Sequence, residues 1–439
     1  MFHRMQWLRL IRCLLALAAL AAAPALTVGV RAASEIHEHG ASGTYPGRVL
    51  DEIARHRRAV LARARSGFVP QSSGTAPAVD VGEIAVIPDD GTLVTAPNLF
   101  DLDFKHLTFR PAGAGYAVEA GSGGFDAAAA TQGTLLNPPP GSQPPGIGDD
   151  DSREISIGFS FPFFGESYST LFINSDGNLT FRAGDSASSD RSLGRILAGP
   201  PRIAPYFADL DPSVAGQLRY VSEPGRLVVT WNQVPDYSSF GIGPRETVQV
   251  ALRADGSIQF SYAGIQGSAA VVAIAPGNSS DPPLVMDFSA AAGQTFLGAA
   301  AEVFAVTSSL DVVAVSQRFY QTHEDAYQYL VVFTNFEFSL NGAFAYELNI
   351  ANAVTGLGRI GLTPTFDYSR DFGSERLESL LNMGNLNRYP ADPAAVFLRG
   401  VDSTLSVLGQ EAGHRFLAYA LFRDPETGAH STELLGRDL

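Results

Sequence analysis

Cysteine is almost absent from this chain of 439 residues, and its single cysteine, Cys13, lies in an apolar N-terminal run. One cysteine excludes a disulfide within the chain, and it leaves the remaining sequence without a thiol nucleophile or a thiolate zinc site. A protein exported without disulfides depends on its hydrophobic core, or on bound metal, for stability.

Basic residues are also scarce, with 30 Lys and Arg against 45 Asp and Glu and a net charge of −15. Such a surface repels nucleic acid and anionic lipid but suits Ca²⁺. The chain also lacks a Gly-rich phosphate loop before a helix and a Gly-x-Ser-x-Gly elbow. These absences argue against the nucleotide-binding and serine-hydrolase classes that carry those motifs.

Long apolar runs are limited to the N-terminus. Arg4, Arg9 and Arg12 precede an Ala/Leu-rich run at 13–26, which is too short for a comfortable membrane span, and Val30-Arg31-Ala32 is an acceptable cleavage site. We therefore expect residues 1–32 to be a signal peptide, with an uncleaved anchor as the alternative. Cleavage removes four arginines and no acids, which lowers the charge by four to −19. The expected product is secreted, extracellular and without stable membrane insertion.

Residues 33–79 read as a disordered segment followed by a basic amphipathic helix. His37-Glu38-His39 is either a loose metal-binding tract or part of a solvated N-terminus. Apolar residues at helical spacing predict a helix over 47–66, whose other face carries Arg55, Arg57, Arg58, Arg63 and Arg65. Such a helix can lie on a membrane, but we favour a spacer helix that packs on an acidic body. Residues 80–149 are expected to form a small β unit and a Gly/Pro-rich linker.

Residues 150–305 predict an antiparallel β-sandwich-like domain. A strand is expected at 155–164, and tight-turn residues separate three pairs of strands: 170–173 and 178–181, 217–221 and 226–231, and 246–253 and 257–262. Several hairpins in succession are typical of sandwich folds.

Ordered motifs in this region resemble the nidogen-like (NIDO) extracellular domain. They begin with Phe161-Pro-Phe-Phe-Gly165 and Phe172-Ile-Asn-Ser-Asp-Gly-Asn178, and continue with Pro205-Tyr-Phe-Ala-Asp209, Val229-Thr-Trp231 and Asp255-Gly-Ser-Ile-Gln-Phe260. The resemblance implies an extracellular interaction or scaffold module of β type without catalysis. Its loops contain Asn174, Asp176, Asp209 and Asp211, which are either calcium ligands or turn residues that bond their own backbone.

Residues 306–439 have a mixed pattern. Strands are expected at 311–318, 326–333 and 344–350, and helices at 374–383 and 402–422. The last helix carries Gln410-Glu411-Ala412-Gly413-His414, and this layout resembles a zincin-type metallopeptidase, an α+β domain with a His-Glu-x-x-His zinc helix. The resemblance implies that His414 binds zinc and that Glu411 is the general base.

The zinc motif departs from that pattern because Gln410 replaces the first histidine, and a neutral amide is a poor zinc ligand. Downstream candidates for a third ligand are His430 and Glu433, and the chain end at Leu439 suggests a truncated product. A metal-free peptidase-like domain, and a site in which Gln410 is a weak ligand, remain open alternatives.

The sequence therefore predicts a secreted multidomain protein of bacterial style that is mainly β. It would combine a nidogen-like binding module at 150–305 with a zinc-metallopeptidase-like domain at 306–439. The alternative is a non-catalytic adhesion or scaffold protein. Zinc and calcium are the candidate cofactors, and the expected partner is an extracellular protein or a matrix or surface ligand.

Overall fold

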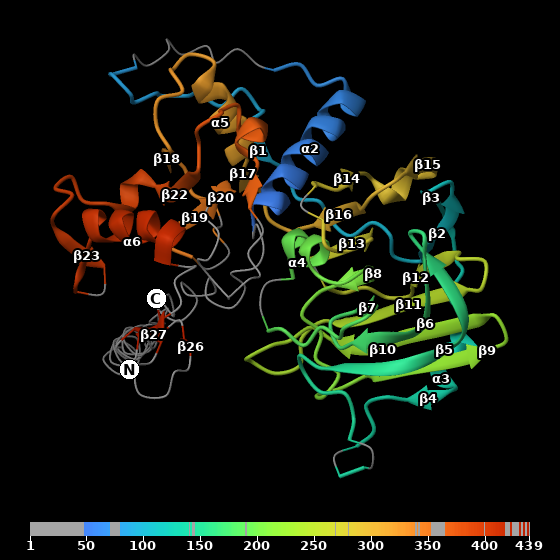
Figure 1. The fold of residues 1–439 in the computed structure, drawn as a ribbon. Coiled ribbons are helices and arrows are strands. Elements are labelled where there is room, and N and C mark those ends of the chain that lie inside the picture. The colour runs from blue at the N-terminus through green and yellow to red at the C-terminus, as the bar shows by residue number, and fades with distance from the viewer. Residues whose placement is uncertain are drawn as a thin grey trace, which may run out of the picture.

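The computed structural model describes residues 48–70 and 80–417, with gaps at 140, 143–144, 189–190, 268, 280, 339, 341–342, 353–364 and 399, and four two-residue strands between 422 and 438. The predictions for the signal peptide, for His37-Glu38-His39 and for disorder at 33–46 lie outside these residues. Most of the described chain folds into two large β-sheets, with helices and a smaller sheet beside them (Figure 1). The protein is therefore mainly β, as the sequence predicts.

The first large sheet is eight-stranded and antiparallel throughout, in the order β15-β3-β2-β12-β11-β10-β9-β4. Its strands are β2 (Lys105–Ala112), β3 (Gly115–Ser122), β4 (Thr134–Leu135), β9 (Gln217–Glu223), β10 (Arg226–Pro235), β11 (Arg245–Arg253), β12 (Ile258–Tyr262) and β15 (Ala292–Phe296).

The second large sheet is seven-stranded, in the order β14-β16-β13-β8-β7-β6-β5, and is antiparallel except where β14 meets β16. Its strands are β5 (Ser152–Phe163), β6 (Glu166–Asn174), β7 (Asn178–Thr180), β8 (Arg202–Phe207), β13 (Ala270–Ala275), β14 (Leu284–Val285) and β16 (Ala300–Phe304).

The main core lies between these two sheets. Alternate residues of β5, namely Ile155, Ile157, Phe161 and Phe163, are buried in it, as the period-2 geometry of a half-buried strand requires. Trp231 of β10 is fully buried opposite them, and its indole N–H donates to the Asn174 carbonyl at 3.1 Å. Burial of large aromatic side chains from both sheets holds the sandwich together.

The three predicted hairpins are confirmed as β6–β7, β9–β10 and β11–β12. The β6–β7 turn shows why its glycine is needed. Gly177 has φ +66°, and a Cβ at this position would collide with the carbonyl of Tyr206 in β8. Only glycine combines this backbone conformation with so close an approach.

The expected small β unit within 80–149 is not separate from the sandwich. Strand β2 pairs with β12, and β3 pairs with β15, so both belong to the eight-stranded sheet. The short α3 (Ala127–Thr131) and β4 also lie within 121–151, which the sequence predicts as linker. The paired strands are far apart in the sequence, and local residue patterns do not indicate which distant strands pair with each other.

The predicted basic helix is confirmed as α2 (Val49–Ser66), and its arginines face an acidic body. Arg57 pairs with Asp371 at 2.9 Å, and Arg58 pairs with Glu302 at 3.1 Å and Asp287 at 3.2 Å. Its apolar residues enter a second core with α4 (Leu193–Ala198) and parts of β8 and β13. The helix thus packs on an acidic body, as favoured above, and its role as a spacer stays a prediction.

Beyond the sandwich lies a three-stranded sheet, β18-β22-β19, in which β22 runs parallel to β18 and antiparallel to β19. The expected strands at 326–333 and 344–350 are confirmed as β18 (Tyr329–Thr334) and β19 (Tyr346–Asn349), and the last helix as α6 (Thr404–Leu417). Helix α6 packs on β19 and β22.

Two predicted elements in this region are wrong. Residues 311–318 form a helix, α5 (Val312–Tyr320), because the Asp311 carboxylate caps it by accepting from the Ala314 N–H at 2.9 Å. Residues 374–383 are not a helix, since β22 (Ser379–Asn385) begins within them. All seven residues of β22 are buried, so its apolar run fills a central strand.

Short elements complete the fold. Among the described residues, no helix is both long and apolar enough to cross a membrane. The remaining elements are three 3₁₀ turns and five strand pairs: η1 (Phe288–Ala290), η2 (Ser369–Phe372), η3 (Leu386–Arg388), β1 (Val94–Thr95) with β17 (Ser309–Leu310), β20 (Ala351–Asn352) with β21 (Phe366–Asp367), β23 (Val396–Leu398) with β24 (Asp402–Ser403), β25 (Phe422–Arg423) with β26 (His430–Ser431), and β27 (Glu433–Leu434) with β28 (Arg437–Asp438).

Candidate functional site

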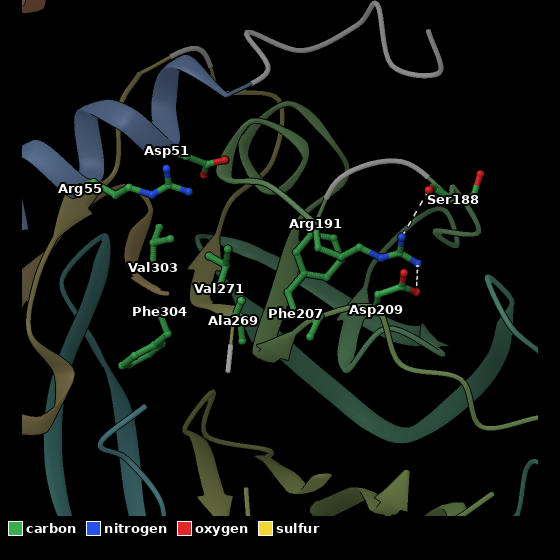
Figure 2. A pocket seen from close by; sticks show the side chains of 12 residues that line it. Asp51, Arg55, Ser188, Arg191, Phe207, Asp209, Ala269, Val271, Val303 and Phe304 are labelled. Atoms are coloured by element: carbon green, nitrogen blue, oxygen red, sulfur yellow. Dashed lines mark hydrogen bonds and ion pairs between the residues drawn. The ribbon is translucent and has the colours of Figure 1, made fainter. Parts of the chain in front are cut away.

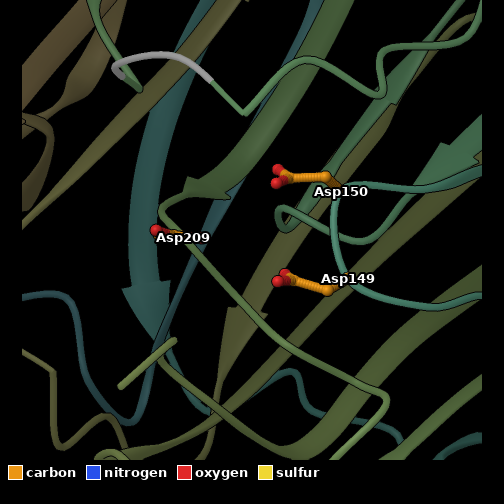
Figure 3. A group of neighbouring side chains, drawn as sticks. All are labelled: Asp149, Asp150 and Asp209. Carbon is orange, nitrogen blue, oxygen red and sulfur yellow. The ribbon is translucent and has the colours of Figure 1, made fainter. Parts of the chain in front are cut away.

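Three aspartates converge at one end of the sandwich. Asp149 and Asp150 lie in the loop before β5, and Asp209 follows β8. One carboxylate oxygen of each lies within 4.8 Å of the others, and the side chains face a common space (Figure 3). Among the described residues, these three aspartates form the group of potential metal-ligating side chains whose ligand atoms are close enough together to contact one ion.

Arg191 is at the centre of this acidic cluster. Its Nη2 contacts Asp150 at 2.6 Å and Asp209 at 2.7 Å, while its Nε donates to Asp176 at 2.9 Å. The guanidinium therefore neutralises charge where a bound cation would otherwise do so. Burial and the neighbouring charge of Asp211 still raise the pKa of Asp149 to about 6.

A cavity of about 330 Å³ opens beside the cluster. Asp51 and Arg55 reach it from α2, and Arg191 and Asp209 line it from the sandwich end (Figure 2). The floor is apolar and comes from β8, β13 and β16, with Phe207, Val271 and Phe304. Charged walls over an apolar floor are suited to binding a side chain or a small polar group.

The four residues proposed from sequence as calcium ligands do not act together. Asp209 joins the acidic cluster, whereas Asp176 is held by Arg191 and is almost fully buried. The Asn174 amide donates to Asn178 at 2.9 Å, and Asp211 accepts from the backbone N–H of Ser213 at 2.8 Å. The Asp211 contact is the local backbone bond that the alternative interpretation expects, whereas the Asn174 contact joins two side chains.

The sequence analysis did not single out Asp149 and Asp150. The signal available was the run Asp149-Asp150-Asp151 at the end of a Gly/Pro-rich segment. That segment was expected to be a linker, and the partner residue Asp209 is about sixty positions away. Only the closing of the sandwich brings the loop before β5 to the end of β8.

The zinc-motif residues of α6 differ in their exposure to solvent. Glu411 and His414 are buried, with Oε2 and Nε2 4.0 Å apart, and burial raises the pKa of Glu411 to about 7. Gln410 is exposed to solvent. Gln410 and His414 are one turn apart and so lie on the same side of α6, but the amide is exposed whereas the imidazole is buried.

The two downstream candidates lie in short strands, His430 in β26 and Glu433 in β27. Their side chains lie outside what the structure describes, so their relation to His414 stays a prediction. Behind α6, burial raises the pKa of Glu347 to about 8, and the Ser379 hydroxyl donates to this carboxylate at 2.7 Å. Glu411 therefore faces another acid across the α6–sheet interface.

Comparison with known proteins bears on the sandwich. Residues 115–302 match the family described as NIDO related. The match begins at β3 and ends in β16, and it confirms the nidogen-like part of the resemblance. It stops before β18, β19, β22 and α6, so it lends no support to a zincin domain.

Curated relatives agree with the family match. Alpha-tectorin of Homo sapiens is 27% identical over 142 residues, which cover 27% of this chain and 6% of the relative. Alpha-tectorin of Gallus gallus is 23% identical over 153 residues, covering 29% of this chain and 7% of the relative. The shared part is thus a small fraction of those proteins. No solved structure matches the chain.

Proposed function

We propose that this protein is a secreted, non-catalytic binding protein whose NIDO-related domain attaches it to an extracellular protein of a matrix or cell surface. The observation that carries this proposal is the family match over residues 115–302, which covers most of the two-sheet sandwich, from β3 to the start of β16. The N-terminal signal-like sequence and the acidic composition support an extracellular location.

The contact surface in this proposal is the sandwich end that bears the acidic cluster. The loop between β10 and β11 lies there, because the Tyr237 N–H donates to the Asp209 carbonyl at 2.6 Å. This loop exposes three large apolar side chains, and Phe240 is 86% exposed. An exposed aromatic beside a charged rim is a feature of protein interfaces. The negative cluster favours a basic partner.

A retention assay tests this function. The purified secreted protein, labelled with a fluorophore, is applied to cell-free matrix and to the surface of the source cells. We expect saturable binding that Phe240→Ser reduces about tenfold or more, because interface aromatics contribute on the order of 2 kcal/mol.

The matched control is Leu297→Ser, which removes another strongly exposed apolar side chain, 74% exposed, from the loop after β15. This variant should bind like the wild type. Binding that is not saturable, or that both variants lower equally, would argue against a specific contact at the β10–β11 loop.

The peptidase alternative depends on one observation, the proximity of Glu411 and His414 on α6. Elemental analysis of the purified protein and of His414→Ala tests it. We expect far less than one zinc per chain in both, because Gln410 faces solvent. One zinc per chain that is lost in the variant would instead support the zincin-like function and call for a proteolysis assay with Glu411→Gln.

A further inference from the structure

Three side-chain oxygens meet inside the sandwich, next to the acidic cluster but distinct from it. They belong to Tyr206 of β8, Asp236 after β10, and Glu246 of β11. Gly267, in the loop between β12 and β13, faces all three. A Cβ at this glycine would lie 2.5 Å from the Tyr206 hydroxyl and 2.7 Å from one oxygen of each acid. The three oxygens therefore surround one point.

Two of these oxygens are buried and lack partners. Tyr206 and Glu246 are both 0% exposed, yet the Tyr206 Oη and the Glu246 Oε1 have no hydrogen-bond partner. Asp236 faces Gly267 with its Oδ2, and its other oxygen, Oδ1, is also buried without a partner. A buried polar atom without a partner costs on the order of 1–3 kcal/mol. Two such atoms at one place, with a third on the adjoining carboxylate, indicate that something absent from the protein chain satisfies them.

The two carboxylates at this place favour the binding of a cation. Burial raises the pKa of Glu246 to about 7, and the charges of Asp236 and Asp103 add to this. Burial also raises the pKa of Asp236 to about 7, with Asp209 adding to it. The contacts that favour the Glu246 carboxylate are neutral, such as the Gln266 N–H, which donates to it at 3.0 Å. Arg191 pairs with the outer aspartates instead.

We propose that Tyr206, Asp236 and Glu246 form a buried binding site for a divalent cation of the calcium type. Hard oxygen ligands of mixed charge are what Ca²⁺ prefers, at about 2.3–2.6 Å. These oxygens lie close together around Gly267, and in this proposal the ion contacts them from the side away from the glycine Cα. The absence of a side chain at Gly267 leaves the space beside them open, and water supplies the remaining ligands.

The location gives this site a structural role. Tyr206 belongs to the seven-stranded sheet, whereas Asp236 and Glu246 belong to the eight-stranded sheet. A cation here joins the two sheets at the end that carries the β10–β11 loop. Ca²⁺ would therefore hold that end closed and offset the repulsion between the two acids.

Calorimetry and thermal unfolding of the purified protein at pH 7.5 test the site. We expect CaCl₂, added after EDTA treatment, to bind with one-site heat and to raise Tm by about 5 °C. In Glu246→Gln, the affinity should fall at least tenfold. Its Tm in EDTA should equal or exceed that of the wild type, because a buried charge is gone.

Terbium luminescence provides a second measurement that does not need Glu246→Gln to fold. Tb³⁺ replaces Ca²⁺, and a coordinating tyrosine sensitises its emission. We expect Tyr206→Phe to remove most of this emission. The control is Asp150→Asn in the acidic cluster, which should leave both the emission and the calcium affinity unchanged.

Two outcomes would overturn the proposal. One is the absence of any Ca²⁺-dependent heat, Tm shift or emission. The other is a calcium response that persists in Glu246→Gln and Tyr206→Phe but is lost in Asp150→Asn, which would place the ion in the outer cluster. Neither result depends on whether the protein binds a matrix partner, since no partner is present in these measurements.

Discussion

At the scale of single residues, the sandwich contains charges that its core has to neutralise. Arg195 and Arg202 are 2% and 1% exposed, and both pair with Asp185, at 2.7 and 2.6 Å. Both guanidinium groups also lie over the ring of Phe207, at 5.1 and 4.9 Å from its centroid. The two arginines hold the pKa of Asp185 down to about 2. One carboxylate therefore serves two buried cations.

Replacement of this carboxylate tests that description. Asp185→Asn should lower the free energy of unfolding by about 3 kcal/mol or more, because both buried arginines lose this carboxylate and Arg195 keeps its longer contact with Asp176, at 3.6 Å. Urea unfolding followed by Trp fluorescence measures the change. Asp255→Asn, in the exposed β11–β12 turn, is the control and should cost less than about 1 kcal/mol. Equal losses in both variants would contradict a special role for Asp185.

At the scale of elements, α2 shows how a helix that is marginal alone becomes fixed. Its apolar N-terminal half is buried with Val49, Leu50 and Ile53, and its C-terminal half is held by ion pairs. Arg58 also donates to the Asn98 amide oxygen at 3.1 Å. Glu302, the acid that receives Arg58, is 1% exposed in β16. The helix therefore stabilises an acid that the sandwich has buried.

Removing Arg58 should be costly for this reason. We expect Arg58→Ala to lower the unfolding free energy by about 3 kcal/mol, since Glu302 remains buried without its cation. The double variant Arg58→Ala/Glu302→Gln should recover much of that loss. Arg65→Ala serves as the control at about 1 kcal/mol or less, because Arg65 is half exposed. No recovery in the double variant would show that packing, and not charge, is what Arg58 contributes.

At the scale of the whole molecule, buried acids set the response to pH. Burial raises the pKa of Asp176, Glu246 and Glu302 to about 7 in each case. In the unfolded chain such groups titrate near 4. The folded state thus binds protons more tightly between roughly pH 4 and 7, and its stability falls as pH rises through that window. Asp185 acts in the opposite sense, but only at pH values below about 4.

Unfolding measured at several pH values checks this sign. In EDTA, the urea midpoint should be higher at pH 5 than at pH 8, and Glu246→Gln should show a shallower fall. Added Ca²⁺ should reduce the difference, because it stabilises the ionised site. A midpoint that climbs steadily from pH 5 to pH 8 in EDTA would show that these acids are not the controlling groups.

The sequence by itself determined the local features of this protein. The hairpins β6–β7, β9–β10 and β11–β12 and the helix α2 follow from residue spacing and turn chemistry within a few positions, and the nidogen-like motifs are short segments recognised by resemblance. These features depend on residues that are close together in the chain, so they can be predicted from the sequence alone.

The tertiary structure decided what long-range contacts determine. Residues 379–385 became a central strand because β18 and β19 flank them, and β2 and β3 joined the sandwich through β12 and β15. The oxygens of Tyr206, Asp236 and Glu246 meet only because two sheets close over Gly267. The sequence around each carboxylate does not indicate which distant residues will lie beside it. Their proximity is a property of the packed sheets and not of the segments that contain them.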